Sequence, residues 1–389
     1  MDFTWIILDN IIFGYSKTFK TAFNNIPVEK IILFDLDNTL IKTKSKKVFP
    51  INKHDWEFLV PTVPEIINKE VENNKTICGI ISNQKGLKSQ FMIKDWIDKL
   101  KAIGQQLAFH FVFVSLKDDR FRKPLPSSWD YIKTNLLDSI NLNNLEYKNK
   151  IYYIGDACGR PGDFSDTDIK YSINCGFKFK TPEIFFKFNQ NIQDIKNCSA
   201  TYPPIPYYTP NEQDKLISNT FNLIKLNINQ KNKIFIMMIG FPASGKSFLR
   251  KEIIKKYPEF KYLNNDDTAN KIIDPNLINK NINKNITSYD YVIEDNTNLN
   301  LKTRTKLLSE FNSYTKIGIF FSHSMDTTKH LNYMRMYWYG AHLISQLVYR
   351  TLNKSFLEPD ILEGFDNMIW IDKVFTNFIF ENNKIKYYF

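Results

Sequence analysis

The amino-acid sequence predicts an α/β protein with two domains, each a mainly parallel sheet flanked by helices. Three observations lead to this fold class. The chain has 389 residues, which is more than one hydrophobic core usually supports. Short apolar runs alternate with helical stretches, a pattern typical of parallel sheets with helical crossovers. A proline-rich segment interrupts this alternation near the middle of the chain.

Four apolar runs in the first half of the chain predict the strands of one sheet. Each run is short and rich in large apolar residues, as strands buried on both faces are. Helical stretches separate them, so we expect most of these strands to run parallel. The runs are Ile31–Phe34, Thr76–Ile81, Phe109–Val114 and Ile151–Ile154.

The proline-rich segment over residues 199–210 marks the domain boundary, because neither a helix nor a central strand accepts several prolines close together. A polar helix is expected directly after it, over 211–226. We therefore predict a first domain over residues 1–198, a linker with a polar helix over 199–232, and a second domain over 233–389. The second domain is expected to contain strands at Ile234–Ile239, Tyr289–Ile293 and Ile317–Phe321, and a solvated insertion at 276–285.

The charge, the apolar runs and the cysteines indicate which partners and which location the protein has. A net charge of +11 and a pI near 9.1 fit a polyanionic partner, although coding bias toward lysine gives the same result. No apolar run approaches the roughly eighteen residues that span a bilayer, and the N-terminus lacks the pattern of a secretion signal. The cysteines form no metal-ligand or redox motif, so we expect reduced thiols in a soluble, intracellular protein. They are Cys78, Cys158, Cys175 and Cys198.

The most specific motif is a phosphate-binding loop that fits G-x-x-x-x-G-K-[ST]. It directly follows the apolar run Ile234–Ile239 and precedes a helix expected over Phe248–Lys256. In this context the N–H groups of the loop point at the phosphates of a nucleotide, the lysine reaches the outer phosphates, and the final serine ligates Mg²⁺. The alternative is a glycine-containing turn that binds nothing. The predicted nucleotide-binding residues are Gly240, Phe241, Pro242, Ala243, Ser244, Gly245, Lys246 and Ser247.

A pair of aspartates, Asp35 and Asp37, follows the first predicted strand. The chain turns where a strand ends, so both carboxylates can reach one pocket. Such a pair suits covalent phosphoryl chemistry, with one acid as the nucleophile and the other as a proton shuttle. Asn38 tolerates the left-handed backbone that a sharp turn requires. Two solvated acids are the alternative, but Thr39 completes a D-x-D-x-T pattern that is far more specific.

Polar residues also follow the later strands of the first domain. Ser82 ends the second apolar run, Lys123 follows the third, and Asp156 ends the fourth, with Asp163 and Asp168 beyond it. Ligands of such sheets bind at the carboxyl edge of the strands, and Mg²⁺ takes carboxylates together with water and phosphate. This order predicts a magnesium and phosphate site. Helix capping by Ser82 and a surface position for Lys123 are the alternatives.

The order of these residues resembles the haloacid dehalogenase phosphohydrolases, and longer motifs resemble the polynucleotide kinase 3′-phosphatases. The motifs occur in that family's order, phosphatase half first and kinase half second. They are Lys-Val-Phe-Pro at 47–50, Ser-Asn-Gln at 82–84, Arg-Lys-Pro at 122–124, Gly-Asp-Ala-Cys-Gly-Arg at 155–160, Asp-Phe-Ser at 163–165 and Thr-Pro-Glu at 181–183. The resemblance implies a haloacid dehalogenase-like Rossmannoid domain joined to a P-loop kinase domain. We expect no N-terminal phosphopeptide-binding module of the kind that animal relatives carry.

In the first domain, the resemblance implies that Asp35 is the nucleophile and that Asp37 is the general acid and base. Ser82 and Lys123 are implied to hold the phosphoryl group. The metal ligands expected there are Asp35, Asp37 and Asp156. Asp163 and Asp168 both match acids of the family, and either one could support the metal.

In the second domain, the resemblance implies that Asp266 accepts the proton of the attacking hydroxyl. Arg335 resembles the lid arginine that stabilises the transferring phosphate, and Asp295 is implied to lie beside the magnesium and phosphate site. The chain departs from many relatives at Asn265 and Tyr333, where they carry arginine. A solvated helix face is the alternative for Arg335.

Together these motifs predict a bifunctional nucleic-acid end-repair enzyme. It is expected to remove a 3′-phosphate and to transfer the γ-phosphate of ATP to a 5′-hydroxyl, with Mg²⁺ and ATP as cofactors. The expected partners are DNA or RNA strand ends, with no membrane, and we expect a monomer. The alternatives are an RNA end-healing kinase/phosphatase and a nucleic-acid-binding scaffold with decayed sites.

Overall fold

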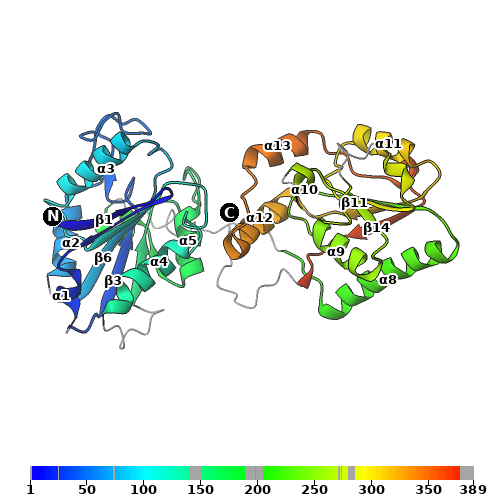
Figure 1. Ribbon diagram of the computed structural model, residues 1–389. Helices are drawn as coiled ribbons and strands as arrows, with labels where there is room; N and C mark the ends of the chain where they lie inside the picture. Colours follow the sequence, from blue (N-terminus) through cyan, green and yellow to red (C-terminus); the bar gives the residue numbers. More distant parts are fainter. Residues whose placement is uncertain are drawn as a thin grey trace. The chain divides into compact units, whose positions relative to one another are not determined.

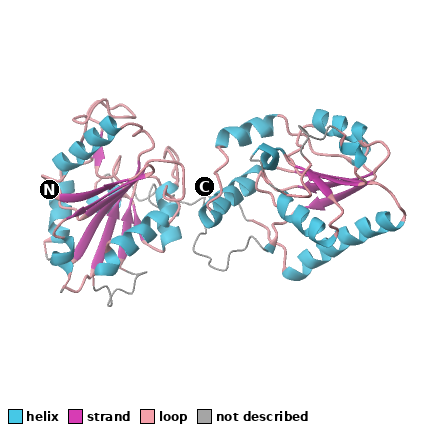
Figure 2. Cartoon of the chain, in the orientation of Figure 1, coloured by secondary structure: helices cyan, strands magenta, loops and turns pink. Residues whose placement is uncertain are grey.

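The computed structural model describes residues 2–24, 26–72, 75–140, 150–188, 198, 205–269, 272, 274–278 and 285–376. The chain folds into two compact units, one within residues 1–202 and the other within 203–381 (Figure 1). Each unit consists of helices packed around its own sheet (Figure 2). The predicted α/β fold class is therefore confirmed.

Among the described residues, the first unit contains a seven-stranded sheet in the order β1-β2-β7-β6-β3-β8-β9. The pairs from β7 to β9 are parallel, as predicted, whereas β1 and β2 pair antiparallel at one edge. The strands are β1 (Phe3–Ile7), β2 (Ile11–Ser16), β3 (Lys30–Phe34), β6 (Thr76–Asn83), β7 (Phe111–Ser115), β8 (Ile151–Ile154) and β9 (Lys178–Lys180). A separate small pair joins β4 (Ile41–Lys42) and β5 (Glu57–Phe58).

Helices cover both faces of the first sheet. Alternate residues of β3 face opposite sides and pack against different helices. Ile32 and Phe34 pack in one core with α2 and α3, while Ile31 and Leu33 pack in the other with α1, α4 and α5. This two-sided burial explains why the strands are continuous apolar runs. The elements are α1 (Phe19–Phe23), α2 (Val63–Val71), α3 (Gln90–Ile103), α4 (Ser127–Asn135), η1 (Leu137–Ser139), α5 (Thr167–Cys175) and α6 (Pro182–Phe186).

The second unit contains a parallel sheet in the order β11-β12-β10-β13-β14. Its strands are β10 (Ile234–Ile239), β11 (Lys261–Leu263), β12 (Tyr291–Glu294), β13 (Thr315–Phe321) and β14 (Asn367–Ile371). Its helices are α8 (Pro210–Asn229), α9 (Lys246–Lys256), α10 (Asn265–Ala269), η2 (Ile286–Ser288), α11 (Leu301–Glu310), α12 (Met325–Tyr339), α13 (Gln346–Lys354) and η3 (Ile361–Glu363). One core contains residues of α8 and α9, and the other contains residues of α11.

The polar helix expected before the second domain is α8. It packs into the core of the second unit through Ile224, which is buried beside residues of β10 and α9. Residues 199–204, expected in the linker, and 279–284, expected in the insertion, lie outside the described residues. Among the described residues, no helix has both the length and the apolar character needed to cross a bilayer.

The expectation of four reduced thiols is wrong for one pair. Cys158 and Cys198 form a disulfide, with their Cα atoms 5.2 Å apart. Their separation of 40 residues gives no local motif, so only the folded chain brings them together. Cys78 is a buried free thiol and Cys175 a partly buried one.

Candidate active sites

The polar residues of the first unit meet at the carboxyl edge of its central strands. β3 lies between β6 and β8, and both neighbours run parallel to it. Asp35, Ser82 and Asp156 therefore emerge at the same edge. The loop after β3 turns sharply at Asn38, whose φ of 56° confirms the predicted left-handed residue.

Three acids form a compact group at this edge. Side-chain oxygens of Asp35, Asp156 and Asp168 all lie within 4.8 Å of one another. Asp168 is only 2% exposed and lies in the first turn of α5. Asp163, the other acid left open by the sequence, forms an ion pair with Arg160 instead. The group thus contains Asp168, whereas Asp37, which we expected among the metal ligands, is outside it.

Lys123 is the cation of this site. Its ammonium donates to Oδ1 of Asp35 at 2.7 Å and to Oδ1 of Asp168 at 2.8 Å, and it also donates to the hydroxyl of Tyr153 at 2.6 Å. The lysine is 4% exposed, so the alternative of a surface lysine is wrong. Asn83 holds its backbone, because the Lys123 N–H donates to the Asn83 side chain and the Asn83 amide donates back to the Lys123 carbonyl.

The acid group carries more negative charge than one lysine can balance. Burial raises the pKa of Asp35 to about 7, and the charges of Asp168 and Asp37 add to this effect against the opposing charge of Lys123. Burial also raises the pKa of Asp156 to about 8, again with help from Asp168 and Asp35. Three clustered carboxylates, with the pKa values of Asp35 and Asp156 raised, are what a divalent cation would neutralise. Because Mg²⁺ prefers oxygen ligands, the residues fit this ion.

Asp37 lies beside the acid group and is held by an amide. The side-chain N–H of Gln84 donates to Oδ2 of Asp37 at 2.6 Å and to the hydroxyl of Ser82 at 3.0 Å. Gln84 thus links the predicted proton shuttle to the predicted phosphate-binding hydroxyl. The sequence contained Gln84 only as part of a motif, and nothing in its spacing predicted this link.

In the second unit, the strand β10 leads into the phosphate-binding loop, and α9 begins at Lys246. Gly245 has a φ of +101°, which favours glycine. A Cβ on Gly240 would lie 2.9 Å from Cβ of Phe321, so a side chain there would displace β13. Lys246 donates to the carbonyl oxygens of Gly240 at 2.9 Å and Phe241 at 2.7 Å. Burial lowers its pKa to about 8.

Charged residues from three other segments influence this lysine. The charges of Asp295, Asp266 and Arg335 all act on Lys246. Asp266 is exposed on α10, Arg335 is partly buried on α12, and Ser247 is exposed in the first turn of α9. The structure thus gathers the predicted kinase residues around one loop.

Arg250 is a residue of this site that the sequence did not single out. Its Nε lies 2.9 Å from Oδ2 of Asp295, which is 2% exposed, and its guanidinium lies 3.7 Å from the ring centre of Tyr262. The arginine follows Lys246 by four residues and so occupies the same side of α9. This helical spacing is the one signal that could have identified it.

The fold and the two sites define the class of protein: a haloacid dehalogenase-like domain and a P-loop domain in one chain. Residues 30–186 match the family model described as polynucleotide kinase 3 phosphatase. The bifunctional polynucleotide phosphatase/kinase of Schizosaccharomyces pombe is 28% identical over 376 residues, which cover 95% of this chain and 84% of that protein. Over nearly its whole length the chain is thus similar to a bifunctional polynucleotide phosphatase/kinase, and its first unit matches the phosphatase family model.

Two further relatives agree with this assignment. A protein of Acanthamoeba polyphaga mimivirus, which bears the same description provisionally, is 29% identical over 387 residues, covering 92% of this chain and 88% of its own. The polynucleotide 3′-phosphatase of Saccharomyces cerevisiae is 28% identical over 206 residues, covering 40% of this chain and 87% of its own.

Proposed function

We propose that this chain is a bifunctional nucleic-acid end-repair enzyme that removes a 3′-phosphate and phosphorylates a 5′-hydroxyl. The observation that carries the proposal is the presence of two separate sites, each at the carboxyl edge of its own parallel strands. The acid group with Lys123 suits phosphoryl hydrolysis, and the loop at Lys246 suits a nucleoside triphosphate. Two relatives matched over more than nine-tenths of the chain bear the corresponding bifunctional description.

The first site supports hydrolysis in two steps. A carboxylate oxygen of Asp35 attacks the phosphorus of the 3′-phosphate, the bond to the 3′-oxygen breaks, and Asp37 donates a proton to that oxygen. An aspartyl phosphate is left on Asp35. Asp37 then takes a proton from a water molecule, which attacks the phosphorus and releases inorganic phosphate. Both acids return to their starting states.

The surrounding side chains hold the phosphoryl group during these steps. Lys123 contacts Asp35 directly, so it can also reach an oxygen of the phosphoryl group that Asp35 receives. The Ser82 hydroxyl is fixed by Gln84 and offers a second donor. Mg²⁺ held by Asp35 and Asp156, with Asp168 in support, would offset the charge of the phosphate and of the acids themselves.

The second site supports transfer of the γ-phosphate of ATP. The backbone N–H groups of the loop over residues 240–247, other than Pro242, and the ammonium of Lys246 can bind the phosphates, and Ser247 offers a hydroxyl to Mg²⁺. Asp266 accepts the proton of the attacking 5′-hydroxyl, and Arg335 stabilises charge on the transferring group. Lys246 now donates to loop carbonyls, and it would exchange these for phosphate oxygens.

The test is an end-conversion assay on a nicked DNA duplex with a 3′-phosphate and a 5′-hydroxyl. With ATP and Mg²⁺, purified protein should yield a 3′-hydroxyl and a 5′-phosphate, and EDTA should abolish both conversions. Failure of both conversions in the presence of Mg²⁺ and ATP would contradict the proposal and favour the scaffold with decayed sites. A parallel arm with RNA ends tests the RNA end-healing alternative.

A further inference from the structure

A second lysine is buried near the phosphatase site, and it has no counter-ion. Lys99 on α3 is 4% exposed, and within the described ranges its ammonium forms no ion pair or hydrogen bond. Buried lysines are normally paired. Lys123 and Lys170 in the same unit follow that rule, with carboxylate oxygens at 2.7 Å from each ammonium. The Lys99 side chain is therefore largely buried, while its ammonium nitrogen is not fully buried and has no counter-ion among the described residues, so it stays accessible to an anion.

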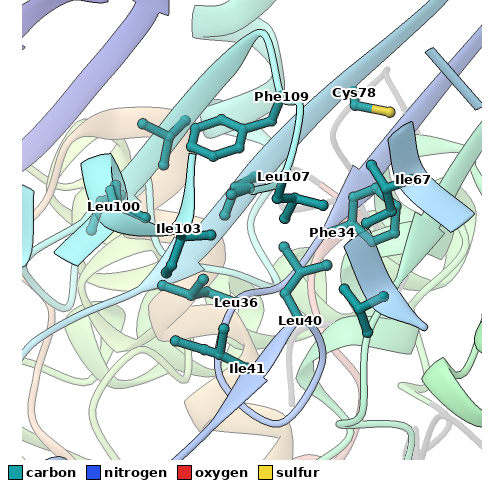
Figure 3. Close-up of a cluster of buried hydrophobic side chains, with 14 of the residues drawn as sticks. Phe34, Leu36, Leu40, Ile41, Ile67, Cys78, Leu100, Ile103, Leu107 and Phe109 are labelled. Atoms are coloured by element: carbon teal, nitrogen blue, oxygen red, sulfur yellow. The ribbon is translucent and has the colours of Figure 1, made fainter. Parts of the chain in front are cut away.

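The helix that carries Lys99 packs on the loop that carries the acid pair. The next residue, Leu100, packs with Ile103 against Leu36 and Leu40 (Figure 3). Leu36 separates Asp35 from Asp37 in the sequence. The buried side of α3 thus rests on the same turn that positions both acids.

Lys123 and Lys99 interact with different acids of the phosphatase site. Lys123 interacts with Asp35 and Asp168. Burial lowers the pKa of Lys99, and the carboxylate that opposes this shift is Asp37. Lys123 therefore serves the side where the phosphoryl group is received, whereas Lys99 is on the helix that packs against the turn of Asp37 and is influenced by the charge of that acid.

This placement matters if the proposed function holds. Asp37 protonates the leaving 3′-oxygen, so the leaving nucleotide lies on the Asp37 side of the site. Beyond that nucleotide, the next negative charge of the strand is the internucleotide phosphate on its 5′ side. Lysines are the usual partners of such phosphates.

We propose that Lys99 binds the internucleotide phosphate on the 5′ side of the terminal nucleotide. It thereby selects a polynucleotide end over a small phosphate ester. The substrate supplies the counter-ion that the free protein lacks, and the inference rests on the proposed phosphatase activity.

The test is a cycle of two protein forms and two substrates. Wild type and Lys99→Met are assayed on a 3′-phosphorylated oligonucleotide whose terminal linkage is either a native phosphate or an uncharged methylphosphonate. Wild type should lose about tenfold to a hundredfold in kcat/KM when the linkage charge is removed, as expected for one charged hydrogen bond. On the native linkage, the kcat/KM of Lys99→Met should already be lower than that of wild type by this factor. Replacing the native linkage with the methylphosphonate should lower the kcat/KM of Lys99→Met by less than about threefold.

Two controls separate binding from folding. Lys101→Met removes an exposed lysine of the same helix, which pairs with Asp98 at 3.3 Å, and it should behave as wild type in the cycle. The melting temperature of Lys99→Met should equal or exceed that of wild type, because methionine keeps the buried apolar stem and the ammonium has no ion pair to lose.

Three results would overturn the inference. They are equal activity of Lys99→Met and wild type on the native linkage, a loss in Lys99→Met by the same factor on both linkages, and a lowered melting temperature with no dependence on linkage charge. If wild type itself releases no phosphate from the native oligonucleotide, the proposed function fails first, and the inference fails with it.

Discussion

At the scale of single residues, burial fixes the protonation of groups away from the sites. His110 is the clearest example, because burial lowers its pKa to about 4. The backbone N–H of Cys78 donates to Nδ1 of His110 at 2.9 Å, and a ring nitrogen that accepts a hydrogen bond carries no proton. The ring centre also lies 5.0 Å from that of Phe23. The folded first unit therefore requires a neutral imidazole.

This requirement predicts a pH dependence of stability. Below pH 6.5 the unfolded chain binds a proton at His110 that the folded chain does not, so stability is lost as the pH falls from about 6.5 to about 4. From pH 7 to pH 5 this group should cost about 2 kcal/mol. Urea unfolding of wild type and His110→Gln at both pH values measures the effect.

His110→Gln should lose about 2 kcal/mol less than wild type over that interval. His54→Gln, a change at an exposed histidine, is the matched control and should show the wild-type dependence. An equal loss in wild type and His110→Gln would show that His110 does not set this slope.

At the scale of elements, helix ends are held by specific side chains. α8 begins with a capping box, in which Thr209 accepts from the Glu212 N–H at 3.3 Å and Glu212 accepts from the Thr209 N–H at 2.8 Å. Pro210 occupies the first turn, where its missing N–H costs nothing. The proline thus starts the helix rather than preventing it.

Loss of this cap should destabilise the second unit alone. Thr209→Ala should lower its free energy of unfolding by about 1 kcal/mol, because one N–H of the first turn loses its acceptor. The control is Thr351→Ala on α13, where the hydroxyl donates only within its own helix to Leu347. Denaturant unfolding followed with a probe in each unit checks this, and an effect of Thr209→Ala on the first unit only would contradict it.

The same scale shows what the sequence could and could not predict. Continuous apolar runs such as Ile151–Ile154 and Ile234–Ile239 match β8 and β10 residue for residue, because burial on both faces leaves a local signal. The β1–β2 hairpin was not predicted, because Asp9 and Asn10, which lie in the turn between the two strands, break the apolar pattern.

The site residues also fall into those that the sequence could predict and those that it could not. Local motifs placed Asp35, Ser82, Lys123 and Asp156 at one edge, because each lies at or beyond the carboxyl end of a strand. The choice of Asp168 over Asp163, the link through Gln84, and the Cys158–Cys198 disulfide depend on contacts between distant segments. Such contacts leave no periodic trace in a single sequence.

At the scale of the whole molecule, the chain combines two chemically distinct sites in two compact units. Each site has its own lysine, Lys123 in the first and Lys246 in the second, and its own acids. The activities should therefore be separable by single substitutions, and one protein should process both ends of a strand break.

The most direct test follows both ends of one nicked duplex, labelled separately, with wild type, Asp35→Asn and Lys246→Ala. Asp35→Asn should lose 3′-phosphate removal and keep 5′-phosphorylation, because only the proposed nucleophile of the first site is changed. Lys246→Ala should show the reverse. An equimolar mixture of the two variants should restore both conversions. If either substitution abolished both conversions in a folded protein, the account of two independent active sites would be contradicted.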